Sequence, residues 1–215
     1  MSSENIQDNK TAARQRSNIY GLLAAVYRQE VTTDLLQQIK DPRFMGVFSD
    51  LGSEKMGLFF QKPDKELLEE LAVEYARLFL GPGKHVSPHE SVHHLRDDGE
   101  GGSLWGKSTV EVKKLIESTG LDYKDAYKGM PDHISVEFEF MQQVILREEK
   151  AWEEADNKTA SDCRQLGKKF IEEHLARWIP TFCDKVIGEA ELPFYREMAA
   201  LTIKFIEFEK ETIDK

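Results

Sequence analysis

The stretch PDHISVEFEF, residues 131–140, decides the fold class of this chain, because two periodicities compete in it. Apolar and polar residues alternate from Ile134 onward, as they do in a half-buried strand. The apolar residues that continue the segment nevertheless keep to one helical face for about five turns; they are Ile134, Phe138, Met141, Ile145 and Trp152. A lone strand would leave its backbone groups unpaired. We therefore predict a helix here, with Pro131 as a stop signal and Asp132 as the N-cap.

Helical spacing of apolar residues recurs through the rest of the chain. It marks segments near residues 19–27, 67–79, 112–116, 166–178 and 194–208. The third of these opens with Ser108-Thr109-Val110-Glu111, which has the pattern of a capping box. Two stretches lack the spacing, Gly81 to Gly106 and Leu121 to Pro131. The prediction is an all-α, single-domain helical bundle at residues 18–215, preceded by a flexible tail at residues 1–17.

Acidic residues outnumber basic residues by 39 to 29 in this chain of 215 residues, which gives a formal net charge of −10. Such a field repels phosphate backbones and anionic lipids, so nucleic acids are excluded as partners and basic segments are favoured. The N-terminal residues are polar, and the nearest apolar run, Leu22 to Val26, is too short for a membrane helix. Cys163 and Cys183 lack metal-ligand spacing. We therefore expect a cytoplasmic protein without stable membrane insertion.

The string His89-Glu90-Ser91-Val92-His93 matches the HExxH pattern of zinc-dependent hydrolases. On a helix the two histidines would share a face and bind one zinc ion, while the glutamate polarised its water. Pro88 and the glycine-rich residues 97–102 confine any such helix to about two turns, so we expect it to be short and exposed. The candidates for a third ligand, Glu111 and Glu117, fit equally well as solvated charges. A loop role is preferred, and a zinc hydrolase is kept as an alternative.

A second pattern, Gly101-x4-Gly106-Lys107-Ser108, has the letters of a phosphate-binding loop. No predicted strand precedes it, and the neighbouring Glu100 would repel phosphates. The letters therefore match while the structural setting does not. A nucleotide-binding switch is a second alternative, and a plain helical interaction module is a third.

Four blocks of the sequence follow one another in a recognisable order; they are YARLFLGP at 75–82, SPHESV at 87–92, LWGKST at 104–109 and PDH at 131–133. The pattern continues through His174-Leu175-x-x-Trp178 and the last apolar segment. In order and spacing it resembles the TorD/DmsD family of redox-enzyme maturation chaperones, over about residues 18 to 210. The departure is Tyr75, where some members have Trp.

The resemblance implies an all-helical cytoplasmic chaperone that is not an enzyme and needs no cofactor, although weak GTP binding is associated with some members. It implies a client that is the precursor of a molybdenum-cofactor oxidoreductase, held by its twin-arginine signal peptide, its apo-enzyme or both until cofactor insertion and Tat export. It also implies that the SPHESV block is a structural loop, so that HExxH is an accident of His89 and His93. The implied client-binding residues are Tyr75, Leu78, Phe79, Pro88, Glu90, Ser91, Trp105, Asp132 and His133.

The chemistry of these residues suits a peptide receptor. A signal peptide has a basic head and an apolar stretch, so its receptor needs an apolar groove beside carboxylates. Tyr75, Leu78 and Phe79 share one helical stripe, and Trp105 is a loop aromatic that could close over it. Asp132 or Glu90 could bind peptide arginines. The alternative is that the stripe is ordinary core and Asp132 an N-cap.

A hinge is predicted at residues 121–131, which join two strongly apolar segments through Gly129 and Pro131. Exchange of such an element between chains would give a domain-swapped homodimer, and the alternative is a monomer. The sequence does not identify the client oxidoreductase, because spacing rules do not give the shape of a groove.

Overall fold

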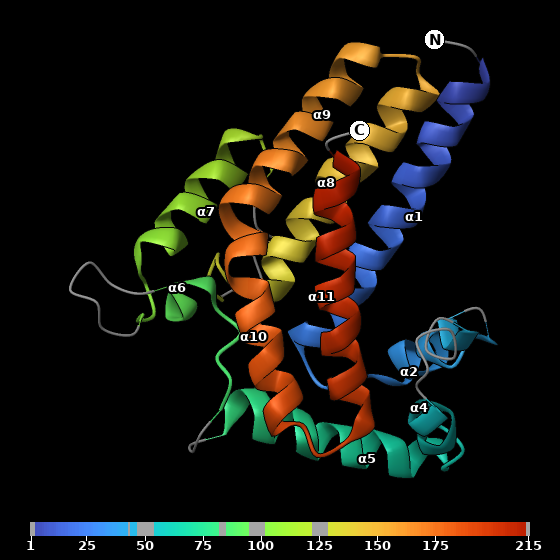
Figure 1. Ribbon diagram of the computed structural model, residues 1–215, viewed down its shortest axis with the longest axis vertical. Helices are drawn as coiled ribbons and strands as arrows, with labels where there is room; N and C mark the ends of the chain where they lie inside the picture. Colours follow the sequence, from blue (N-terminus) through green and yellow to red (C-terminus); the bar gives the residue numbers. More distant parts are fainter. Residues whose placement is uncertain are drawn as a thin grey trace. The chain divides into compact units, whose positions relative to one another are not determined.

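The computed structural model describes residues 3–42, 44–46, 54–81, 85–94, 102–121 and 129–213 (Figure 1). Within these ranges the regular structure is helical, and the only bridge between extended segments is an isolated one that joins His89 and His133. The all-α prediction is therefore confirmed. None of the helices in these ranges has both the length and the hydropathy that a membrane span requires.

The described residues fall into two compact units. Unit 1 takes those from residues 1–24, 89–178 and 206–215, and unit 2 takes those from residues 25–88 and 179–205. Each unit is assembled from segments that are far apart in the sequence, so each depends on contacts that no local pattern reveals.

The helices of unit 1 are α6 (Glu90–His93), α7 (Lys107–Ser118), α8 (Ile134–Glu153), α9 (Asn157–Phe170) and the π-helical η2 (Ile171–Leu175), together with most of α1 (Ser3–Arg28), the first residues of α10 (Ala176–Glu189) and the end of α11 (Pro193–Ile213). Helices α8 and α9 lie side by side (Figure 1). Asp156 lies between them and caps α9, because its carboxylate accepts a hydrogen bond from Thr159 N at 3.0 Å.

Helix α8 confirms the helix predicted from residues 131–140. Its N-cap is His133, whose Nδ1 accepts a hydrogen bond from Ser135 N at 3.2 Å. Asp132, which was predicted as this cap, lies one position earlier and binds elsewhere. The strand-like alternation has its own explanation, since the polar residues Ser135 and Glu137 are buried together with their apolar neighbours. The polar half of the pattern is therefore not a solvent-facing side.

The first part of α1 is fixed to unit 1 by buried ion pairs. Residues 3–17, expected as a flexible tail, are helical in the structure. Arg16 donates to the two carboxylate oxygens of Glu209 at 2.8 and 2.9 Å and to Glu148 at 3.2 Å. Both glutamates are buried. The polar composition that suggested a tail thus includes a basic residue with partners on α8 and α11.

Unit 2 contains α2 (Thr33–Ile39), α4 (Glu54–Phe59), α5 (Asp64–Tyr75) and the π-helical η1 (Ala76–Leu80), together with the end of α1, most of α10 and the first part of α11. Helix α5 passes directly into η1. The core of the unit is aromatic, since the ring centroid of Phe79 lies 6.2 Å from that of Tyr27, 6.1 Å from Phe182 and 5.8 Å from Tyr195. Such ring contacts stabilise a core beyond the area that they bury.

Two further predictions concern the capping box at residues 108–111 and the hinge at residues 121–131. The capping box expected at residues 108–111 does not form, because α7 begins at Lys107 with Gly106 as its N-cap and without a side-chain cap. Ser108 and Thr109 are instead buried. Of the hinge predicted at residues 121–131, positions 122–128 lie outside the described residues.

Candidate functional site

Three of the sequence blocks meet in a buried polar cluster of unit 1. Glu90 comes from the SPHESV block, Asp132 from the PDH block, and His174 and Trp178 from the HLxxW pattern. Each of these side chains is almost completely buried. Helix α8 adds a fifth, Glu137, and the end of α6 adds His94. We name the following residues the Glu90 cluster: Glu90, His94, Asp132, Glu137, His174 and Trp178.

The Glu90 carboxylate is the centre of this cluster. Its Oε2 lies 3.0 Å from His174 Nδ1, and its Oε1 lies 2.9 Å from His94 Nε2. Burial alone would raise the pKa of Glu90, but the hydrogen bonds from His174 and His94 outweigh it and lower the pKa below its usual value. Glu90 is therefore ionised at neutral pH although the residue is only 1% exposed.

Asp132 fixes the start of α6. Its Oδ2 accepts a hydrogen bond from Ser91 N at 3.0 Å, and its backbone carbonyl accepts one from Glu90 N, also at 3.0 Å. The adjacent residues His89 and His133 form the isolated bridge, with their ring centroids 5.0 Å apart. Asp132 is thus a helix cap, as one interpretation held, but it caps α6, through Ser91, which lies 41 residues earlier in the chain. The residue is 0% exposed.

Glu137 is the second carboxyl group of the cluster and is also fully buried. Its Oε2 accepts a hydrogen bond from Trp178 Nε1 at 3.0 Å, whereas no donor reaches its Oε1 within the described part of the chain. Burial raises the pKa of Glu137 well above its usual range, and the charge of Glu90 raises it further. An ionised carboxylate and a neutral carboxyl group are therefore neighbours in this cluster.

Glu137 was not among the predicted site residues, although the sequence carries a signal for it. It follows Ile134 by three positions and precedes Met141 by four, and both of these belong to the apolar face of α8. A carboxyl group on an apolar helical face is expected to be buried and to have a shifted pKa. The position of Glu137 on this face can be read from the sequence alone.

The HExxH string does not have the geometry of a zinc site. His89 has an extended backbone and lies before α6, so it does not share a helical face with His93. The His93 ring lies 5.3 Å from that of Trp178, and the Glu90 carboxylate binds other histidines. The helix is short, as predicted, but Glu90 and Ser91 are buried, so the expected exposure was wrong. Among the described residues, no three His, Cys, Asp or Glu side chains are placed to hold a metal ion.

The segment before α7 packs on α6. A Cβ atom on Gly102 would overlap the carbonyl oxygens of Ser91 and His94, so glycine is required for this close approach. Gly101, which belongs to the phosphate-loop pattern, lies outside the described residues. Trp105 is 71% exposed and has a φ of 64°, a conformation that costs energy for a residue other than glycine. An exposed aromatic residue in a strained conformation is a typical feature of a binding surface.

The predicted apolar stripe lies in the core of unit 2. Tyr75, Leu78 and Phe79 are 3, 1 and 4% exposed, and the Tyr75 hydroxyl donates to the carbonyl of Tyr27 at 3.1 Å. Pro88 is buried as well. The side chains of Leu78 and Phe79 therefore do not form the floor of an open groove. This is the core arrangement that was the alternative interpretation of the stripe.

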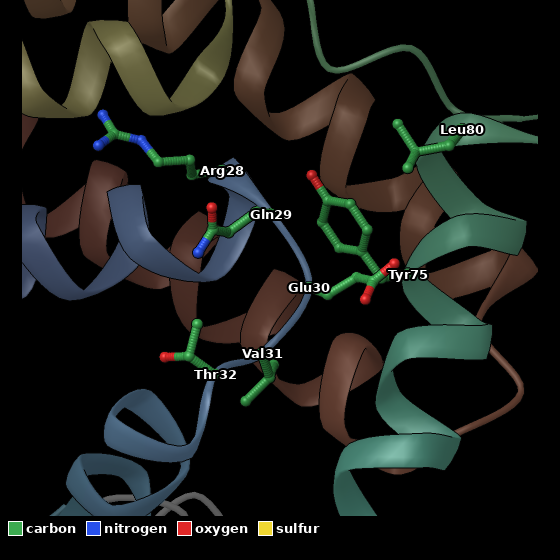
Figure 2. A pocket seen from close by; sticks show the side chains of 7 residues that line it. All are labelled: Arg28, Gln29, Glu30, Val31, Thr32, Tyr75 and Leu80. Carbon is green, nitrogen blue, oxygen red and sulfur yellow. The ribbon is translucent and has the colours of Figure 1, made fainter. Parts of the chain in front are cut away.

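Tyr75 also lines an open pocket on unit 2, with a volume of about 410 Å³ (Figure 2). The lining side chains are Arg28, Gln29, Glu30, Val31, Thr32, Tyr75 and Leu80, and we name this the Tyr75 pocket. Leu80 is 65% exposed, and Glu30 lies beside the Tyr75 ring in Figure 2. Burial, followed by the charge of Glu30, raises the pKa of Tyr75 to about 12. The lining of the pocket thus includes both an exposed apolar side chain and a carboxylate, and the sequence predicted neither Glu30 nor Leu80 as a site residue.

Comparison with known proteins places this chain among maturation factors of redox enzymes. A family model described as the nitrate reductase delta subunit matches residues 48–184. Chaperone protein TorD of Vibrio parahaemolyticus is 26% identical over 218 residues, which cover 93% of this chain and 95% of that protein. Chaperone protein TorD of a Psychrobacter species is 25% identical, and the match covers 98% of this chain and 96% of that protein.

Among solved structures, a proposed redox enzyme maturation protein from Archaeoglobus fulgidus has a TM-score of 0.52 and 22% sequence identity, and the match covers 89% of this chain and 93% of that chain. This likeness supports the all-helical fold. The family model matches more than half of the chain, and the curated relatives are TorD chaperones, which form a non-enzymatic family. The chain therefore belongs to the TorD/nitrate reductase delta family of redox enzyme maturation chaperones.

Proposed function

We propose that this protein binds the precursor of a molybdenum-cofactor oxidoreductase in the cytoplasm and holds it until the cofactor is inserted. The contact is made through the twin-arginine signal peptide, through the apo-enzyme or through both. Membership of the family supplies the general role of a redox enzyme maturation chaperone. The identity of the client and the use of the signal peptide are the proposed part.

The observation that carries this proposal is the Tyr75 pocket. A signal peptide combines basic residues with an apolar stretch, and the exposed Leu80 and the carboxylate of Glu30 both line the pocket (Figure 2). A guanidinium group forms charge-assisted hydrogen bonds with a carboxylate, so Glu30 is a suitable partner for a peptide arginine. The net charge of −10 would further attract a basic peptide. Glu30 takes the role first considered for Asp132, which is buried as a cap.

The remaining predicted residues keep separate roles within this proposal. Phe79 supports the Tyr75 ring, with the two ring centroids 5.1 Å apart, and Leu78 is buried in the core of unit 2. Glu90, Ser91, Asp132 and His133 fix the start of α6 and α8 in unit 1, and Pro88 directly precedes that region. Trp105 is an exposed contact that is available to the mature part of the client.

The proposal is tested by capture of the client from the native cytoplasm. Tagged wild-type protein is expected to retain a molybdenum-cofactor oxidoreductase whose signal peptide is uncleaved, as identified by mass spectrometry. Leu80→Ser should reduce the captured amount severalfold, since it removes the exposed apolar contact of the pocket.

Val73→Ser is the matched control for this capture, because Val73 is 70% exposed on α5 of the same unit and does not line the Tyr75 pocket. It should leave the captured amount unchanged. Recovery of no oxidoreductase precursor would contradict the proposed client, and equal loss with both variants would contradict the proposed pocket.

A further inference from the structure

The Glu90 cluster contains a pair of carboxyl groups whose arrangement the chaperone role does not explain. Glu137 Oε1 has no donor within the described residues, and the charges that act on Glu137 are the carboxylates of Glu90 and Asp132. Its other oxygen, Oε2, accepts a hydrogen bond from Trp178 Nε1 at 3.0 Å. The histidines His174 and His94 bind Glu90 and so do not neutralise Glu137.

An ionised Glu137 would place another negative charge in a site that is closed to water. Glu90, Asp132 and Glu137 are 1, 0 and 0% exposed. Buried charges of like sign are strongly unfavourable, whereas a single proton converts the pair into a donor and an acceptor. A proton on Glu137 Oε1 removes one of these charges. It also makes Oε1 a hydrogen-bond donor, so that this atom no longer depends on a donor from elsewhere.

We propose that Glu137 and Glu90 share one proton, and that this proton locks residues 89–94 onto α8. The start of this segment is also held by two hydrogen bonds, which Glu90 N and Ser91 N donate to Asp132. These backbone bonds link the segment to Asp132, two residues before α8, and the shared proton links it to Glu137 in the first turn of that helix. Loss of the proton separates the two carboxylates and releases the segment.

The lock has a pH window whose limits follow from the two carboxyl groups. The pKa of Glu90 is lowered, so its contribution to stability is present above its unfolded pKa and is lost as the pH falls through the lowered folded value. The pKa of Glu137 is raised, so its contribution is present below its unfolded pKa and is lost as the pH rises through the raised folded value. Between these limits the pair holds one proton and the lock is closed.

The titratable groups around the pair come from each neighbouring element. Helix α6 and its end supply Glu90 and His94, η2 supplies His174, and the segment before α8 supplies Asp132. Helix α10 supplies the Trp178 N–H to Glu137, and the ring of His93, from α6, lies 5.3 Å from the Trp178 ring. When the pH rises, none of these groups gains a positive charge that could offset the ionisation of Glu137. The alkaline limit is therefore the one that opens the lock.

Hydrogen exchange at the amides of Glu90 and Ser91 tests this inference in the full-length protein. After correction for the base catalysis of intrinsic exchange, wild-type protection should fall by about tenfold for each pH unit above the pKa of Glu137. Glu137→Gln keeps an oxygen acceptor for Trp178 but has no proton to lose, so its protection should be independent of pH across this range. The control Glu139→Gln, on the same helix, should behave as wild type.

A measurement on the wild-type protein alone makes the test independent of how well the variant folds. With ¹³C-labelled glutamate carboxyl groups, one glutamate should remain protonated at neutral pH and should titrate together with the loss of amide protection. A spectrum in which every glutamate is ionised at neutral pH would overturn the proposal. The same pH dependence in Glu137→Gln and wild type would overturn it as well.

Discussion

Asp132 shows how one buried carboxylate fixes two segments that are far apart in the sequence. Its side chain caps α6 through Ser91 N, while its own backbone leads into α8. A backbone N–H that is buried without an acceptor costs free energy, because folding removes it from water. The effect of substitutions at this position therefore depends on whether an acceptor oxygen remains.

We predict that Asp132→Ala lowers the free energy of unfolding by about 1–3 kcal/mol, since Ser91 N loses its acceptor. Asp132→Asn retains an oxygen at this position and should cost clearly less. Urea unfolding of the two variants checks the difference. Equal losses would show that the cap is not the source of the stabilisation.

Arg16 makes the corresponding contribution in α1, where one guanidinium group neutralises two buried glutamates. Removal of one partner from a buried ion pair leaves uncompensated charge, which costs about 3–5 kcal/mol. We therefore predict a loss of this size in the free energy of unfolding of Arg16→Ala, because Glu209 and Glu148 are buried. Thermal and urea unfolding provide the measurement.

Arg14→Ala is the control for Arg16→Ala. The Arg14 side chain is 70% exposed and lies 3.8 Å from Glu149, so its pair is of the weak, solvent-screened kind. Its loss should change the free energy of unfolding by less than about 1 kcal/mol. A small effect of both substitutions would mean that residues 3–17 contribute little to the fold, as the polar composition first suggested.

At the scale of the element, η1 separates a core residue from a surface residue at adjacent positions. Phe79 packs among the rings of Tyr27, Phe182 and Tyr195, whereas Leu80 is exposed in the Tyr75 pocket. We predict that Phe79→Ala lowers the free energy of unfolding by about 3–5 kcal/mol, because it leaves a cavity in the core. Leu80→Ala should change it by less than about 0.5 kcal/mol.

The same pair of variants distinguishes stability from binding. Leu80→Ala should weaken precursor binding while the protein stays as stable as wild type in thermal unfolding. A Phe79→Ala variant as stable as wild type would contradict the core role of Phe79.

Elements differed in how far the sequence could predict them. Helix α8 was predictable because the spacing of Ile134, Phe138 and Met141 is a local property of the chain. The cap formed by Asp132 was not, because its partner Ser91 lies 41 residues away and only the folded chain brings them together. Helical spacing also cannot distinguish a core from a groove, and for that reason Leu78 and Phe79 were equally compatible with both.

The candidate site was predictable in part for a similar reason. The blocks that contain Glu90, Asp132 and His174 could be recognised in the sequence, but their convergence depends on tertiary structure. Glu137 was detectable as an acid on an apolar helical face. Glu30 follows the end of α1 and Leu80 ends η1, so the Tyr75 pocket arises only when these two segments come together in unit 2.

At the scale of the whole molecule, the acidic composition favours a client with basic segments, and the client proposed above carries a basic and apolar leader. The net charge of −10 predicts that association with such a leader is faster at low salt, since ions screen long-range attraction. The apolar contact at Leu80 is expected to carry most of the affinity, and the carboxylate of Glu30 mainly to orient the peptide.

The most direct test is calorimetric titration of the protein with a twin-arginine signal peptide and with the same peptide carrying two lysines in place of the arginines. We predict binding of the arginine peptide that is tighter by about 1–3 kcal/mol, because the guanidinium group forms charge-assisted hydrogen bonds with a carboxylate. In Glu30→Gln this preference should largely disappear, while the fold stays intact in thermal unfolding. Absence of binding to any twin-arginine peptide, or an unchanged arginine preference in Glu30→Gln, would contradict the account.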